Sequence, residues 1–199
     1  MMGISMRHVL EQGPMLRTLG GAALTALKRH DATKGKPSLP GPWVSAEVAP
    51  PSEALIRAFV KNSGGDPSSY RGIIPPHLFS QWAMPVAFKV IADTPYPLTR
   101  VMNAGCRFDQ ELPLPAGERL IVKARLESID DDGKRAILTT RVVTGTASAP
   151  DALISEVRAF VPLARKGEGN GKSREKKSPA IVPTDARELA YVRLRASAG

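Results

Sequence analysis

Apolar and polar residues alternate most clearly in the last third of the region before residue 164. From Leu120 to Leu126 every second residue is apolar, which is the period of a half-buried antiparallel strand, and this strand is expected to run to Ile129. The inward set is Leu120, Val122, Ala124 and Leu126, and the outward set begins with Ile121, Lys123, Arg125 and Glu127. A second run from Ile154 to Leu163 places Val157, Ala159 and Val161 on one face in the same way. Both segments are predicted to be strands.

A turn follows the first of these strands. The run from Asp130 to Lys134 is polar, and Gly133 within it can adopt a positive φ. We therefore expect a hairpin whose second strand runs from Arg135 to about Val143. A fourth strand is expected upstream, from Val101 to Phe108.

Two helices are predicted before the strands. Ser52 is a suitable N-cap for a helix that begins at Glu53 and ends at Gly64 and Gly65. The segment from His77 to Ile91 has helical length and an apolar composition, but Pro85 lies inside it. A proline inside a helix costs about 3 kcal/mol, so we expect a kink or a split near Met84.

Two helices followed by antiparallel strands indicate an α+β domain in which a curved sheet wraps a helix. The domain is expected to span residues 41–164. Residues 1–40 form a basic leader with one partly helical stretch, and residues 165–199 form a basic linker and tail rich in glycine, lysine and serine.

Composition limits the classes of function. The 199 residues carry 28 Lys and Arg against 19 Asp and Glu, a formal net charge of +9, which favours anionic partners such as acidic lipid, nucleic acid or coenzyme A. The basic run at residues 165–177 lacks interleaved aromatic residues, so nucleic acid is not expected. One cysteine and three scattered histidines predict neither a disulfide framework nor a metal site. Without a long apolar run, we expect a cytoplasmic chain with no membrane span.

Three segments resemble the MaoC-like acyl dehydratases and (R)-specific enoyl-CoA hydratases, which have the hot-dog fold. They occur in the family's order within residues 45–163: Gly65–Tyr70, Ile74–Phe79 and Leu112–Leu120. The resemblance implies an antiparallel sheet around an interrupted central helix. It also implies an acyl thioester of coenzyme A or of an acyl carrier protein as substrate, without a separate cofactor.

The family's catalytic motif is Gly-Asp-x-Asn-Pro-x-His, whose Asp and His activate a water molecule. Gly65 and Asp66 match its start, Ser68 and Ser69 replace the Asn and Pro, and Tyr70 is aligned with the His. A phenol with a pKa of about 10 is a poor base at neutral pH. His77 is the alternative base, although its position after Pro75 and Pro76, at the start of the central helix, favours a structural role. Asp66, Tyr70 and His77 are therefore the candidate catalytic residues.

The altered motif resembles the N-terminal, non-catalytic half of a double hot-dog hydratase, which shelters the acyl chain. In such enzymes the other half holds the dyad, and Pro85 fits because the sheltering half often has an interrupted helix. The resemblance thus implies pairing with a second hot-dog domain, in a homodimer or a heterodimer. The candidate substrate-binding residues are Pro76, His77, Phe79, Trp82, Met84 and Phe88.

Other interpretations remain open at this stage. Met84, Phe88 and their apolar neighbours also fit an ordinary core, and Cys106 is expected to pack in that core. A hot-dog thioesterase would need a carboxylate near the central helix, for which Asp66 and Glu111 are the candidates. A non-catalytic acyl-CoA-binding protein is the third alternative.

Overall fold

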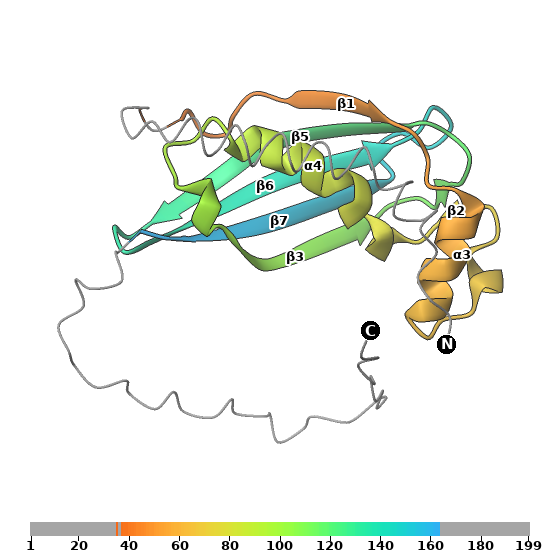
Figure 1. Cartoon of the computed structure of the whole chain (residues 1–199). Coiled ribbons are helices and arrows are strands. Elements are labelled where there is room, and N and C mark those ends of the chain that lie inside the picture. The colour runs from red at the N-terminus through yellow and green to blue at the C-terminus, as the bar shows by residue number, and fades with distance from the viewer. Residues whose placement is uncertain (1–34, 36, 164–199) are drawn as a thin grey trace, which may run out of the picture. The chain divides into compact units, whose positions relative to one another are not determined.

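A computed structural model of the chain describes residue 35 and residues 37–163. Its main feature is a five-stranded antiparallel sheet in the order β1-β5-β6-β7-β3, crossed on one face by helix α4 (Figure 1). The strands are β1 (Val44–Val48), β3 (Met102–Gln110), β5 (Leu120–Asp131), β6 (Arg135–Gly145) and β7 (Leu153–Pro162). Most of the expected leader and the whole expected tail lie outside the described residues.

The three central strands confirm the alternation in the sequence. In β5 the four expected inward residues are all buried, and in β7 Val157, Ala159 and Val161 are buried between more exposed neighbours. β6 adds a row that includes Leu138 and Val142 on the same face. These apolar side chains form the floor of the core beneath α4, and their removal from water stabilises the layered packing.

The β5–β6 hairpin forms at the polar turn that the sequence predicted. Gly133 adopts a φ of 78°, a conformation that other residues rarely take. Asp132 accepts hydrogen bonds through Oδ1 from the backbone N–H groups of Lys134 and Arg135, at 2.9 and 2.8 Å. Side-chain acceptance of turn amides fixes the reversal locally, which explains why the pattern could be recognised without tertiary information.

Strand β3 is present as expected, but it lies at the edge of the sheet and all nine of its residues are exposed. Cys106 is therefore exposed and does not pack in the core. The prediction for Cys106 was wrong because the edge strand has β7 on one side only, and apolar neighbours in the sequence do not reveal that position. The ladder also shifts between Asn103 and Cys106, where Gly105 has a φ of 112°.

Helix α3 (Glu53–Asn62) begins and ends as predicted. Ser52 is its N-cap and accepts a hydrogen bond at its Oγ from the N–H of Leu55, at 3.2 Å. Only Ile56 and Val60 are buried, so α3 is an amphipathic helix with one thin apolar stripe. It lies beyond the end of the sheet, close to the small β2 strand (Figure 1).

Helix α4 (Ser80–Ile91) continues through Pro85 as one element, so the expected split near Met84 is wrong. The interruption instead precedes the helix. A 3₁₀ turn, η2 (Pro76–Leu78), follows Pro75 and joins α4 through Phe79. The two prolines favour a tight helical start, while burial of the Pro85 ring offsets the backbone bond that it cannot donate.

Short elements connect α3 to α4 and α4 to the sheet. They are η1 (Pro67–Tyr70), β2 (Ile73–Ile74), which pairs with β4 (Leu114–Pro115), and η3 (Leu98–Arg100). Neither β1 nor the β2–β4 pair was predicted. Ile74 and Leu114 are fully buried in this pair, which fixes the chain just before η2.

Candidate functional site

Asp66 is the N-cap of η1 and both of its carboxylate oxygens are engaged locally. Oδ1 accepts from the backbone N–H of Ser68 at 2.9 Å, and Oδ2 accepts from the hydroxyl of Ser68. These bonds lower the pKa of Asp66, the hydroxyl contributing most. The carboxylate is also exposed, so it has the properties of an ionised cap rather than those of a general base tuned toward neutral pH.

Tyr70 and His77 come together as an aromatic cluster. Their ring centroids lie 5.8 Å apart at an angle of 72°, and the ring of Phe59 lies 5.2 Å from that of His77 on its other side. His77 is half-buried within η2, directly before α4. Among the described residues no hydrogen bond joins Asp66 to either ring, so the three candidate catalytic residues do not form a dyad with Asp66.

The spacing of the motif also requires a correction. Counted from Gly65, the histidine position of Gly-Asp-x-Asn-Pro-x-His is the seventh, which Arg71 occupies, and Tyr70 fills the variable sixth position. A guanidinium remains protonated at every physiological pH and cannot accept a proton from water. The substitution therefore removes a base from this position more completely than a phenol would.

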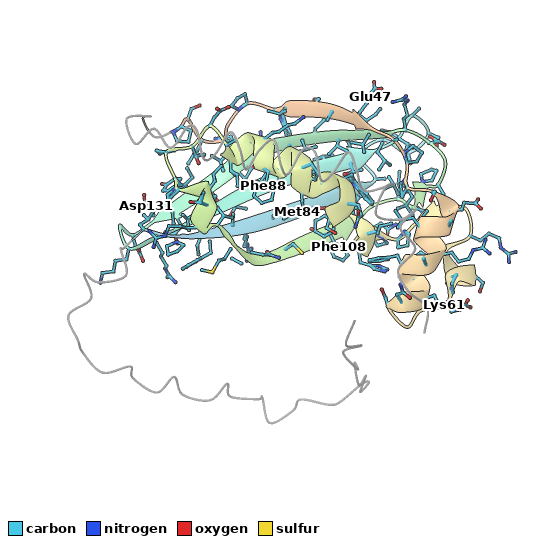
Figure 2. The ribbon with its side chains drawn as sticks, in the orientation of Figure 1. Glu47, Lys61, Met84, Phe88, Phe108 and Asp131 are labelled. Carbon is cyan, nitrogen blue, oxygen red and sulfur yellow. The ribbon has the colours of Figure 1, made fainter. Side chains whose placement is uncertain are left out.

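The start of α4 lies beside the open edge strand. Phe79 is the N-cap residue, and its side chain makes no capping hydrogen bond. Its buried ring lies 5.7 Å from the ring of Phe108 on β3, which is 39% exposed. Figure 2 shows Phe108 at the end of β3 that is nearest to the start of α4. In this first turn the Trp82 N–H donates to the Phe79 carbonyl at 3.1 Å, whereas the N–H groups of Ser80 and Gln81 have no partner among the described residues. This end therefore presents those two amides next to an apolar surface.

The other candidate substrate-binding residues have different environments. Trp82 is only 2% exposed, and its Nε1–H donates to the Thr144 hydroxyl on β6 at 3.1 Å. It ties α4 to the sheet within the core. Met84 and Phe88 are half-buried along α4 (Figure 2) and pack against two different core clusters. Pro76 is half-buried in η2.

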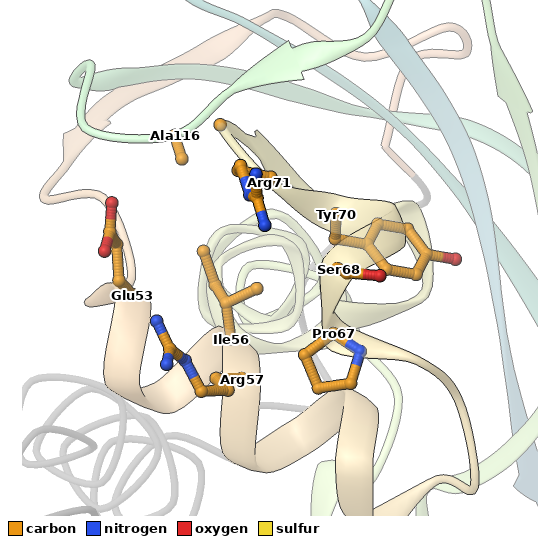
Figure 3. A pocket seen from close by; sticks show the side chains of 9 residues that line it. Glu53, Ile56, Arg57, Pro67, Ser68, Tyr70, Arg71 and Ala116 are labelled. Carbon is orange, nitrogen blue, oxygen red and sulfur yellow. The ribbon is translucent and has the colours of Figure 1, made fainter.

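A separate cleft of about 220 Å³ opens between α3 and the segment around η1 (Figure 3). Nine residues line it: Glu53, Ile56, Arg57, Pro67, Ser68, Tyr70, Arg71, Gly72 and Ala116. Tyr70 thus contacts His77 with one side of its ring and borders this cleft as well. Two guanidinium groups on the wall give the cleft the chemistry of an anion site.

Within residue 35 and residues 37–163, no cluster of three His, Cys, Asp or Glu side chains is placed to bind a metal. In the same range, no helix has the length and apolar character needed to cross a membrane. Glu111 is exposed after β3, and its backbone N–H donates to the Ala152 carbonyl at 2.9 Å.

This architecture has counterparts among solved structures. No model of a protein family matches the sequence, and no curated protein matches it. Solved structures do match. The HadBC (3R)-hydroxyacyl-ACP dehydratase complex of Mycobacterium tuberculosis is 14% identical with a TM-score of 0.52, and the match covers 63% of this chain and 99% of that chain. The chain has the hot-dog fold.

Two further solved structures with this fold resemble the chain. HtdX of M. tuberculosis is 15% identical with a TM-score of 0.50, over 61% of this chain and 51% of HtdX. A MaoC-like dehydratase from Rhodospirillum rubrum is 17% identical with a TM-score of 0.46, over 64% of this chain and 94% of that chain. The hot-dog fold predicted from the sequence is confirmed, and the match with HtdX extends over only about half of that protein.

Several residues at this hot-dog site were not predicted from the sequence. Arg57 and Phe59 come from α3, shortly before Gly65 in the sequence, whereas Phe108 comes from β3, far from the motif that includes Asp66. Arg71 stands at the last position of the motif, and the spacing of the motif alone is sufficient to identify it. For Phe108 no sequence signal was available, because its contact with Phe79 depends on the curvature and order of the sheet.

Proposed function

We propose that this chain is the acyl-thioester-binding hot-dog domain of an (R)-specific enoyl-CoA hydratase or 3-hydroxyacyl dehydratase. In this role it shelters the acyl chain, and a second hot-dog domain supplies the Asp/His dyad. The thioester is carried by coenzyme A or by an acyl carrier protein. The following observations support each part of this assignment.

The observation that carries the proposal is the contact between Phe79 and Phe108. It places an apolar surface at the first turn of α4, beside a sheet edge that no other described element covers. The thioester carbonyl would accept hydrogen bonds from the first-turn amides of α4, which stabilises negative charge on that oxygen. The acyl chain would lie against Phe108 and the half-buried side chains of α4.

Asp66 and Arg71 support the proposal that this domain does not catalyse hydration by itself. Asp66 is held ionised by two hydrogen bonds from Ser68, and Arg71 stands at the histidine position. Hydration needs a group that accepts a proton from water and a group that donates one to the substrate carbon. We therefore assign both roles to the partner domain, while His77 positions Tyr70 and Phe59.

Strand β3 is the proposed contact with the second hot-dog domain. Its exposed Met102 and Phe108, and nearby Leu112, offer apolar area beside unpaired backbone groups. Edge-to-edge pairing would bury both and bring the partner's residues to the start of α4. The HadBC dehydratase is described as a complex, and the match with HtdX leaves about half of that protein without a counterpart here, which supports a two-domain unit.

A chain-length series of saturated acyl-CoA molecules tests the proposal. Each buried methylene contributes roughly 0.8 kcal/mol, so affinity measured by calorimetry should rise several-fold with every two carbons, from butyryl-CoA onward. Phe108→Ala should flatten this series. Ile121→Ala is the matched control because Ile121 is 40% exposed, against 39% for Phe108, and lies on the opposite face of the sheet.

Affinity that does not depend on chain length would contradict acyl sheltering. Release of free coenzyme A during the titration would instead identify a thioesterase. Binding with normal chain-length dependence, but with no partner domain able to add hydration activity, would describe a non-catalytic acyl-CoA-binding protein.

A further inference from the structure

The cleft beside α3 is lined by two arginines that approach it from different elements. Arg57 lies in the middle of α3, and Arg71 follows η1 directly. Figure 3 shows both guanidinium groups directed into the cleft, with Ile56 between them and Ser68 and Tyr70 on the far wall. Two donors held by separate elements give the site a defined geometry rather than one mobile charge.

Neither guanidinium is neutralised by an ion pair within residues 37–163. Other arginines in this range do form ion pairs, as Arg107 does with Asp109 and Arg125 does with Glu127. Glu53, in the first turn of α3, lines the same cleft. Among residues 37–163 it forms no ion pair with Arg57 or Arg71. Two positive groups against one negative group leave the cleft with a net positive charge.

Arginine is suited to phosphate because its planar guanidinium donates two parallel hydrogen bonds to two oxygens. A cleft of about 220 Å³ has room for a phosphate group with its attached atoms. Carboxylates would bind the same groups with less charge, so a ligand that carries phosphate makes the better match.

We propose that Arg57 and Arg71 bind a phosphate group of the molecule that carries the thioester. This inference rests on the proposed function and names the part of the substrate that the cleft holds. The link is Tyr70, which lines the cleft and also contacts the ring of His77 immediately before α4. One ligand therefore reaches both places, with its phosphate in the cleft and its acyl group at the start of α4.

The test compares ligands with and without phosphate on the full chain and three variants. Arg57→Ala and Arg71→Ala should each weaken binding of octanoyl-CoA by about tenfold, as expected when one charge-assisted pair is lost. Both side chains are exposed, so the fold should be retained, which a thermal melt checks. Arg158→Ala is the matched control because it removes the same charge from the exposed face of β7.

Octanoyl-pantetheine, which has no phosphate, should bind all four proteins equally. Octanoyl-4′-phosphopantetheine separates the two sources of phosphate. If it shows the same arginine dependence as octanoyl-CoA, the cleft binds the phosphate that coenzyme A and acyl carrier proteins share. If only octanoyl-CoA shows it, the cleft binds the nucleotide phosphates of coenzyme A.

Two results distinguish failure of this inference from failure of the proposed function. If octanoyl-CoA binds wild type, Arg57→Ala and Arg71→Ala equally, the phosphate subsite is wrong and acyl binding stands. If octanoyl-pantetheine does not bind but ADP binds with the expected loss in both arginine variants, the cleft binds phosphate and the assignment of an acyl-thioester site is wrong.

Discussion

The two edges of the five-stranded sheet differ in how they meet solvent. Strand β1 has five residues, alternates between half-buried and exposed positions, and is preceded by Pro42 and followed by Pro50 and Pro51. Strand β3 has nine residues, contains no proline, and is exposed along its whole length. Short strands and prolines prevent further strand pairing, whereas a long exposed edge strand leaves more backbone groups available for it.

This difference is the reason for proposing β3, rather than β1, as the edge that pairs with a second domain. On β3, residues of both faces are exposed, so even Phe108, which contacts Phe79 before α4, is only partly covered. The register shift between Asn103 and Cys106 divides the ladder with β7 into two stretches, of which the longer runs from Cys106 to Gln110. That part includes Phe108, so the proposed pairing surface and the proposed acyl surface coincide.

The largest expected effect comes from a charge placed on the β3 edge. We expect the purified chain to pair with a second copy through β3 when no other hot-dog domain is present. Phe108→Asp should weaken this dimer by roughly 30-fold or more, because a central apolar contact contributes about 2 kcal/mol or more. Sedimentation velocity across a concentration series measures the change.

Ile121→Asp is the control for that experiment, since Ile121 is equally exposed and lies outside β3. A dimer that persists in Phe108→Asp and dissociates in Ile121→Asp would move the interface away from β3.

A smaller effect, on the free energy of unfolding, is expected from replacing Tyr96, which precedes β3 in the sequence. The hydroxyl of Tyr96 donates to Asp131 Oδ2 at 2.8 Å, and burial followed by this bond raises the pKa of Tyr96 from 10.0 to about 12. Folding thus favours the neutral phenol, and its stabilisation is present below pH 10 and is lost as the pH rises toward 12. Tyr96→Phe should cost about 2 kcal/mol at pH 7.

Urea unfolding of wild type and Tyr96→Phe at pH 7 and pH 11.5 measures this difference. The gap between the two proteins should shrink at the higher pH, and a constant gap would show that the hydroxyl does not titrate as described.

Replacing Trp43, which directly precedes β1, should change the free energy of unfolding less. The Arg125 guanidinium lies 4.6 Å from the ring centroid of Trp43, which is 44% exposed. Trp43→Ala should reduce the free energy of unfolding by about 0.5–1 kcal/mol through loss of this cation–π contact. The dimer dissociation constant from sedimentation should stay unchanged, and a change in it would assign β1 a part in pairing.

The smallest effect is expected at Glu118, which lies in neither edge. Its carboxylate accepts from the Ser148 hydroxyl at 2.6 Å and from the Ser148 N–H at 3.2 Å. The hydroxyls of Ser148 and Thr146, then that N–H, lower the pKa of Glu118 below 4.5. Its stabilisation is therefore present above pH 4.5 and is lost as the pH falls through the lowered pKa.

Glu118→Gln should melt slightly below wild type at pH 7, and at pH 3 the two melting temperatures should converge. Thermal melts at pH 7 and pH 3 check this. A difference in melting temperature that grows at pH 3 would contradict the stabilisation by the ionised Glu118 carboxylate.

Local sequence signals account for the parts of the fold that depend on neighbours along the chain. The period of two in β5 and β7, the Asp132–Gly133 turn and the Ser52 cap all act within a few residues, so each was predictable. β1, the β2–β4 pair and the edge position of β3 depend on distant partners. The continuation of α4 through Pro85 as one helix was missed because packing, which the sequence does not display, outweighs the local cost.

The candidate site shows the same division. His77 and Phe79 were found because they stand beside Pro75 and Pro76, and the structure places them at the start of α4. Trp82 was proposed to contact substrate but donates to Thr144 within the core, a contact between residues 62 positions apart. The hydrophobic periodicity of the sequence does not indicate contacts between residues so far apart.

The central claim is that this domain binds an acyl thioester without a catalytic dyad of its own. The most direct measurement is the absorbance of trans-2-octenoyl-CoA mixed with excess purified chain, under conditions where calorimetry shows that the ligand is bound. If the domain has no catalytic dyad of its own, the enoyl-thioester absorbance should stay constant. Loss of that absorbance by the wild type, abolished in Asp66→Ala, would show that Asp66 is catalytic and would contradict the account.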